Sequence, residues 1–259
     1  MTLATEEIKT CCAAAYGSPA ARVLLGDSFH PGGVALTRRL IRSLGLDDRS
    51  VAVDVACGPG TSALELARET GCAVIGVDLS AANVAEAKRA ADVAGLAVRV
   101  SFLVGDAEAL PLDTSSADGA LCECALCTFP DKRTAVRELA RVLKPGARLA
   151  LSDMTADVAR LPDELRTLQA WVACIADARP FDEIAELLSG EGFVVESLDR
   201  HDDALAHLLD RVEARLKVLA MTAAMSSGDL ELGSSLIKLA RDAVAAGTLG
   251  YGSVIARRS

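Results

Sequence analysis

The chain has 259 residues, of which 27 are basic and 36 acidic, so its formal net charge is −9 at pH 7. Only 3% of the residues are aromatic, whereas nucleic-acid binding favours a positive surface and base recognition often adds stacked rings. We therefore expect no DNA or RNA substrate. The length suffices for one large domain with a substantial core.

Two features of the sequence argue against export and against a membrane location. Glu6, Glu7 and Lys9 interrupt the first apolar stretch, so this stretch does not resemble a signal peptide. No uninterrupted apolar run reaches the length of a membrane-spanning helix. We expect a cytoplasmic protein with no membrane partner, in which the eight cysteines are free thiols rather than structural disulfides.

Residues 1–45 are expected to be helical, with breaks at Pro19 and at the turn 30–33. The last of these helices is amphipathic and ends near Gly45, because its apolar residues recur at helical spacing. From there on, apolar strands alternate with helices, and strands are predicted at 51–56, 73–77, 98–104, 119–123 and 148–153. This alternation favours a parallel doubly wound sheet, whose ligands bind at the carboxyl ends of the strands.

After residue 153 the pattern changes, and helices are predicted at 161–176 and 181–188, followed by a sixth strand at 193–198. Residues 203–246 are expected to form two or three helices, and residues 251–257 a last strand. No linker rich in Pro, Gly or Ser and no internal repeat divides the sequence. We expect one domain over 1–259, comprising a helical cap (1–45), a cofactor-binding core (46–155) and substrate-side helices with the last two strands (156–259).

The most informative segment is 51–61, which combines a buried strand, a glycine turn and a helix start before a second strand that ends in Asp78. Gly58 and Gly60 permit a sharp turn and the close approach of a ligand, and Asp78 lies where an acid binds ribose hydroxyl groups. Asp54 discriminates between cofactors. Its carboxylate would repel the phosphates of a dinucleotide but attract the ammonium and sulfonium groups of S-adenosylmethionine.

Together with further motifs at 105–112, 118–123 and 139–148, this segment resembles the class I S-adenosylmethionine-dependent methyltransferases over about residues 45–155. The resemblance implies a seven-stranded, doubly wound, Rossmann-like α/β sheet with an antiparallel last strand, here with helical additions at both ends. It also implies an enzyme that transfers a methyl group from S-adenosylmethionine to a small-molecule substrate.

The same resemblance implies a set of cofactor-binding residues at the ends of the first four strands. Those around the methionine part of the cofactor would be Asp54, Ala56, Gly58 and Gly60. Those around the adenosine would be Asp78 at the ribose, Leu79 on the adenine, and Asp106 and Ala107 at the adenine edge. Glu123 would add a negative charge near the sulfonium.

The fourth strand leads into residues 122–127, which contain three cysteines. With residues 149–154 and 171–181, this segment resembles the arsenite methyltransferases. The resemblance places Cys124 and Cys174 at the positions where that family holds trivalent arsenic. Soft thiolates select thiophilic centres, and a thiolate-bound arsenite keeps a lone pair that can attack the methyl group.

We therefore expect an acceptor such as trivalent arsenic, with catalytic thiols supplied by Cys124, Cys174, Cys12 and Cys11. The last two resemble the N-terminal cysteines of the arsenite methyltransferases in kind. No resident metal is expected, because the pair Cys124 and Cys127 is not followed by the second pair of a zinc site.

A second interpretation treats the cysteines as packing residues, since cysteine is among the residues most often buried. The acceptor would then be an organic oxygen, nitrogen or sulfur atom, and a hydroxyl acceptor must lose its proton. His30, His201, Tyr16 and Glu123 are the candidate general bases. A third possibility, a scaffold that binds the cofactor without catalysis, is disfavoured because the cofactor-binding set is intact.

The acceptor pocket is expected at the ends of the fourth and fifth strands, under a roof of N-terminal helices and residues 155–185. No other element is long enough to cover the cofactor, and methyl transfer benefits from the exclusion of water.

Overall fold

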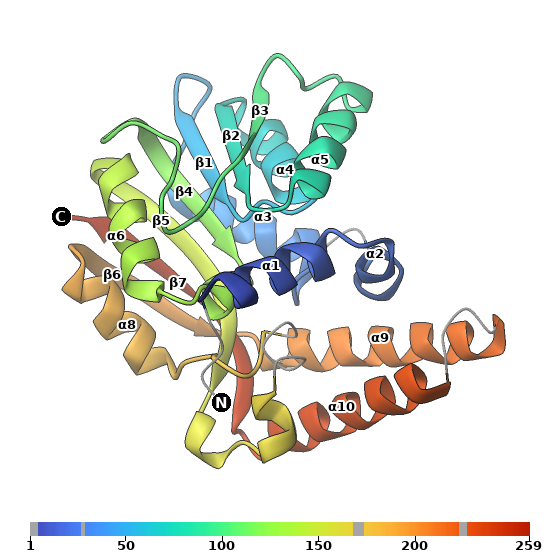
Figure 1. The fold of residues 1–259 in the computed structure, drawn as a ribbon. Coiled ribbons are helices and arrows are strands. Elements are labelled where there is room, and N and C mark those ends of the chain that lie inside the picture. The colour runs from blue at the N-terminus through green and yellow to red at the C-terminus, as the bar shows by residue number, and fades with distance from the viewer. Residues whose placement is uncertain (1–4, 27–28, 168–173, 223–226) are drawn as a thin grey trace.

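The computed structural model describes residues 5–26, 29–167, 174–222 and 227–259 (Figure 1). Within them, seven strands form one sheet in the order β3-β2-β1-β4-β5-β7-β6. The strands are β1 (Val51–Val55), β2 (Ala73–Asp78), β3 (Val100–Val104), β4 (Ala117–Glu123), β5 (Leu143–Ala156), β6 (Phe193–Arg200) and β7 (Leu249–Arg258). Strands β1 to β5 are parallel, and β7 is antiparallel to both β5 and β6. The predicted fold class is confirmed.

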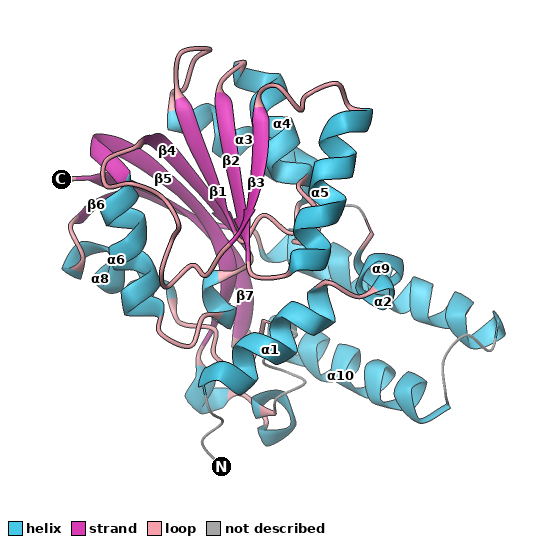
Figure 2. Cartoon of the chain, turned by 45° about the horizontal axis from the view of Figure 1, so that its top comes forward, coloured by secondary structure: helices cyan, strands magenta, loops and turns pink. Residues whose placement is uncertain are grey.

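Helices cover both faces of the sheet (Figure 2). They are α1 (Thr5–Tyr16), α2 (Pro19–Leu25), α3 (Gly33–Leu44), α4 (Thr61–Thr70), α5 (Ala81–Val93), α6 (Lys132–Val142), α8 (Phe181–Gly190), α9 (Asp202–Thr222) and α10 (Ser227–Ala245). α3, α4 and α5 pack on one face, whereas α6 and α8 pack on the other. α9 and α10 form a long hairpin beside the sheet. None of the described helices has the length and apolar character to cross a bilayer.

The central strand β1 explains why the sheet is buried on both faces. Its residues alternate between the two cores, with Ala52 in the core under α3 to α5 and Val53 and Val55 in the core under α6 and α8. Asp54 is the one acid in this strand, and it is 2% exposed. A carboxyl group at such a position requires a functional explanation, because burying it is unfavourable.

Most of the predicted elements are present, with two differences. β5 begins at Leu143, because the segment after α6 already pairs with Ala117 at the start of β4. The helix predicted over 161–176 is wrong for the described part, where 163–166 form only a short 3-10 turn. Pro162, with ψ of 149°, is extended and lacks the N–H that a helix needs. Residues 168–173 lie outside the described part of the chain.

Candidate functional site

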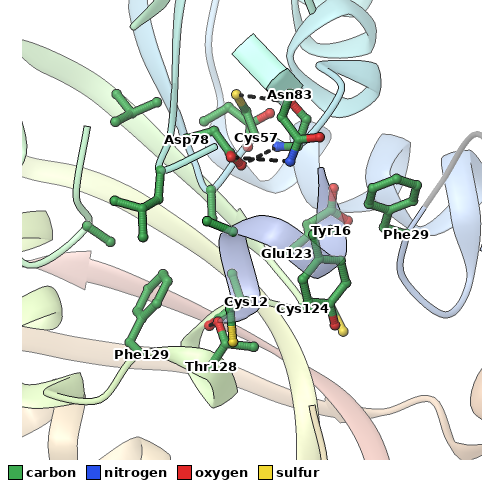
Figure 3. A pocket seen from close by; sticks show the side chains of 18 of the residues that line it. Cys12, Tyr16, Phe29, Cys57, Asp78, Asn83, Glu123, Cys124, Thr128 and Phe129 are labelled. Carbon is green, nitrogen blue, oxygen red and sulfur yellow. Dashed lines mark hydrogen bonds between the residues drawn. The ribbon is translucent and has the colours of Figure 1, made fainter. Parts of the chain in front are cut away.

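A pocket opens at the carboxyl ends of β1, β2 and β4, beneath α1 (Figure 3). Its empty space is about 1090 Å³, including the part open to solvent. Asp78 and Asn83 lie at one end, whereas Cys12 and Cys124 lie at the other. The pocket is therefore at the sheet edge where a doubly wound fold binds ligands.

Most of the residues expected at the cofactor line this pocket. They are Asp54, Ala56, Gly58, Asp78, Leu79, Asp106, Ala107 and Glu123. Gly60 is not among the lining residues. It precedes α4 with φ of 87°, and a Cβ there would lie 2.8 Å from side-chain atoms of Ala87 and Phe102. The need for glycine at this position thus arises from the turn and its packing.

The carboxylate of Asp78 is held by hydrogen bonds from the chain around it. One oxygen accepts from the Gly58 N–H at 2.8 Å, and the other accepts from the Ser80 N–H at 2.8 Å and Asn83 Nδ2 at 3.2 Å. Burial raises the pKa of Asp78, although these bonds oppose the shift. Sequence reasoning missed Asn83, whose signal is its place three residues after the N-cap Ser80.

Asp54 and Glu123 form an acidic centre beside Asp78. Asp54 Oδ2 is buried and has no hydrogen-bond partner among the described residues. Burial raises the pKa of Asp54 well above its ordinary value, and the charges of Glu123 and Asp78 add to the shift. Glu123 accepts hydrogen bonds from Ser62 Oγ at 2.6 Å and Thr37 Oγ1 at 3.1 Å. A cation is the partner that this centre lacks.

Helix α1 forms one wall and the roof of the pocket. Lys9 Nζ lies 2.7 Å from Asp106 Oδ2 and 2.6 Å from Glu108 Oε2, so it joins α1 to the loop after β3. No local sequence pattern indicates these ion pairs, because Lys9 is far from Asp106 and Glu108 along the chain. The described residues of 155–185 do not line the pocket, whereas Lys9, Cys12 and Tyr16 of the N-terminal segment do.

Three of the cysteines form a group, and a fourth, Cys12, lies on the pocket wall. The sulfur atoms of Cys124, Cys127 and Cys174 all lie within 4.8 Å of one another. Cys12 lines the pocket, whereas Cys11 does not. Burial and the charges of Cys174 and Cys11 raise the pKa of Cys12 to about 12. The structure thus brings Cys124 and Cys174 together as expected, and Cys127 completes the group.

One thiol of the group is acidic. Hydrogen bonds with the thiols of Cys124 and Cys127 and with the Tyr16 hydroxyl lower the pKa of Cys174 well below its ordinary value. Tyr16 Oη lies 3.0 Å from Cys174 Sγ. Asp153 lies close by, and burial together with the charge of Cys174 raises its pKa to about 7.

Three of the four candidate general bases line the pocket: Tyr16, His30 and Glu123. His30 Nδ1 lies 3.0 Å from the Pro31 carbonyl oxygen, so it is the protonated nitrogen. Its Nε2 lies 3.5 Å from a carboxylate oxygen of Glu123. His201 does not line the pocket, and its Nε2 is 2.8 Å from the Ser253 hydroxyl.

Comparison with known proteins places these observations in a family context. Residues 53–151 match a family model described as a methyltransferase domain. The O-methyltransferase resE of Aspergillus sclerotiorum is 31% identical over 227 residues, covering 86% of this chain and 82% of the relative. The O-methyltransferase cnsE of Penicillium expansum is 31% identical over 229 residues, covering 87% and 78%. Phosphoethanolamine N-methyltransferase 2 of Haemonchus contortus, solved with S-adenosyl-L-methionine, shares the fold with a TM-score of 0.78 and 20% identity, covering 92% of this chain and 56% of that one.

Proposed function

The chain belongs to the class I S-adenosylmethionine-dependent methyltransferases, and we propose that it methylates an oxygen atom of a small organic molecule. S-adenosylmethionine is its methyl donor. The proposed oxygen acceptor rests on the two relatives named as O-methyltransferases, each of which aligns with more than four fifths of this chain. It rests equally on the proton-accepting groups in the pocket wall.

The pocket residues fit the cofactor. Asp54 carries a buried oxygen without a partner beside two further carboxylates, and a cationic amino acid group would supply that partner. We assign Asp54 to this group and Asp78 to the ribose hydroxyls. Asp106 and Leu79 are assigned to the adenine. When bound, the cofactor supplies a methyl group on a positively charged sulfur atom.

The observation that carries the proposal is the buried pair of His30 and Glu123. A hydroxyl acceptor must lose its proton as its oxygen attacks, and a positioned imidazole is the side chain most often used for this. With Nδ1 donating to the Pro31 carbonyl oxygen, Nε2 is the nitrogen of His30 that can accept that proton, and the Thr37 hydroxyl lies 3.3 Å from it. The carboxylate of Glu123, 3.5 Å away, then stabilises the imidazolium. Tyr16 suits this role less well, because burial raises the pKa of its hydroxyl and keeps it protonated.

The other residues of the wall shape the acceptor site. The rings of Phe29, Tyr16 and Phe129 line it, so the acceptor is expected to have an apolar body. Helix α1 covers the site and excludes water, and the Lys9 ion pairs hold this helix in place.

The test is methyl transfer from labelled S-adenosylmethionine to a panel of phenols, aliphatic alcohols, amines and thiols. We expect transfer to a hydroxyl compound, and we expect His30→Gln to lower kcat by about 10²- to 10⁴-fold with unchanged cofactor affinity. His207→Gln is the matched control, because His207 is exposed on α9. Transfer only to amines or thiols, or full activity of His30→Gln, would contradict the proposal.

A second candidate acceptor is trivalent arsenic, supported by the three sulfur atoms within 4.8 Å of one another. Thiolates would hold the arsenic and its lone pair would attack the methyl group, so His30 would not be needed. Arsenite belongs in the same assay. This candidate requires that Cys124→Ser and Cys174→Ser each abolish arsenite methylation while His30→Gln retains it. Arsenite turnover that survives both cysteine substitutions would exclude it.

A further inference from the structure

Cys124, Cys127 and Cys174, here called the thiol cluster, come from two segments of the chain that are far apart in sequence. Cys124 follows β4, Cys127 lies in the short 3-10 helix Leu126–Thr128, and Cys174 lies fifty residues after Cys124. Cys127 and Cys174 are each 3% exposed, whereas Cys124 is partly exposed and lines the pocket. The thiol cluster is therefore a buried group of sulfur atoms with one side towards the pocket.

Neighbouring groups hold the cluster in a fixed arrangement. Cys174 Sγ approaches the Cys124 carbonyl oxygen at 3.6 Å and Tyr16 Oη at 3.0 Å. Asp153 Oδ2 accepts a hydrogen bond from the Cys127 N–H at 2.8 Å. Cys124 and Cys174 also have positive φ, 52° and 63°, which residues with a side chain seldom adopt. Such backbone conformations persist only where the surrounding structure determines them.

We propose that the thiol cluster binds one soft d¹⁰ metal ion such as Zn²⁺ through three thiolates. Zinc binds thiolate sulfur at about 2.3 Å, which places the sulfur atoms of a tetrahedral site about 3.8 Å apart. The sulfur atoms of the cluster already lie within 4.8 Å of one another, so small side-chain rotations complete the geometry. Thiolates select soft ions over hard ones such as Mg²⁺.

Three thiolates leave one coordination position of a tetrahedral ion for another group. The Tyr16 oxygen is 3.0 Å from Cys174 Sγ, and Tyr16 and Cys124 both line the pocket, so we expect the fourth position to face Tyr16 and the pocket. A d¹⁰ cation has no lone pair to offer a methyl group, so it is not the acceptor. The inference is therefore independent of the proposed hydroxyl acceptor, whereas trivalent arsenic would occupy the same thiolates as the metal ion. Binding displaces protons from the thiols, and the affinity should rise with pH.

The sequence spacing does not predict this site. In a sequence, zinc sites are recognised by two closely spaced pairs of ligands. Here Cys124 and Cys127 form a single pair, and the third ligand, Cys174, is distant in sequence. Cys174 reaches the pair because the chain after β5 returns to the end of β4, where β4 and β5 are neighbours in the sheet.

The test uses the reduced, metal-free, full-length protein titrated with Cd²⁺, a d¹⁰ ion whose bonds to thiolates absorb in the ultraviolet. We expect saturation at one ion per chain with the absorbance of three cadmium–sulfur bonds, and displacement by Zn²⁺. Three thiols should become protected from alkylation. Because this experiment needs no variant, it remains valid if the substituted proteins fold poorly. No absorbance at one equivalent, or protection of fewer than three thiols, would overturn the proposal.

Substitutions then locate the ion. Cys124→Ser, Cys127→Ser and Cys174→Ser should each weaken Cd²⁺ binding by about tenfold or more, because a hydroxyl is a poor ligand for a soft ion. Cys72→Ser is the matched control, since Cys72 is buried like Cys127 and Cys174 but lies immediately before β2, outside the cluster. Equal affinities in the cluster variants and the control would place the ion elsewhere and overturn the assignment.

Discussion

Gly60→Ala is expected to destabilise the protein by about 2–5 kcal/mol, the sum of a backbone and a packing contribution. Gly60 has φ of 87°, and a side chain in the left-handed region costs about 1–2 kcal/mol. Its Cβ would lie 2.8 Å from Ala87 Cβ and from Phe102 Cζ. Both neighbours are buried and cannot easily move, and overpacking of this kind costs about 1–3 kcal/mol.

Gly95→Ala separates the two contributions. Gly95 also has positive φ, 67°, but a Cβ there meets no heavy atom within 4 Å. It should lose only the backbone contribution, about 1–2 kcal/mol. The measurement is urea unfolding of both variants and the parent protein, compared at equal m-values. Equal losses in the two variants would refute the reasoning that packing against Ala87 and Phe102 requires glycine at position 60.

Two further predictions concern buried carboxyl groups. Asp54→Asn should weaken S-adenosylmethionine binding by about tenfold to a hundredfold in calorimetry. It should nevertheless raise the unfolding free energy at pH 7, because it removes a buried acid beside the charges of Glu123 and Asp78, one of whose oxygens has no hydrogen-bond partner among the described residues. Asp153 has a folded-state pKa of about 7 against an ordinary 3.8. Its protonated form therefore stabilises the fold at low pH, and about 4 kcal/mol of this stability is lost as pH rises from 4 to above 7. The asparagine of Asp153→Asn has no titrating group. The unfolding free energy of this variant, measured relative to that of the parent protein, should therefore rise by about 4 kcal/mol between pH 4 and above 7.

Each of these predictions has an outcome that would contradict it. Loss of stability together with cofactor binding in Asp54→Asn would indicate that Asp54 supports the fold rather than a cation. A constant difference between Asp153→Asn and the parent protein from pH 4 to 8 would mean that Asp153 is ionised throughout.

The sequence by itself determined the sheet and the residues that line the half of the pocket proposed for the cofactor. Strand, glycine turn and helix follow one another within 51–61, so their geometry depends on local preferences. The separation of Gly58 and Asp78 is likewise set by one helix and two adjacent strands. In the structure, the Gly58 N–H donates a hydrogen bond of 2.8 Å to the Asp78 carboxylate. The exception is the helix predicted over 161–176, which is absent from its described residues: Pro162 is extended, and only a short 3-10 turn follows it at 163–166.

Only the tertiary structure decided the contacts that helix α1 makes over the pocket. Lys9 meets Asp106, which we assign to the adenine, across 97 residues, and Tyr16 meets Cys174, on the proposed acceptor side, across 158. Likewise, the sequence does not distinguish His30 from His201 as the general base. In the structure, His30 lines the pocket and His201 does not. Spacing along the chain fixes distances within a strand–turn–helix unit. Contacts between distant segments depend instead on the order of strands in the sheet and on how the N-terminal helices pack over its edge, which no local pattern encodes.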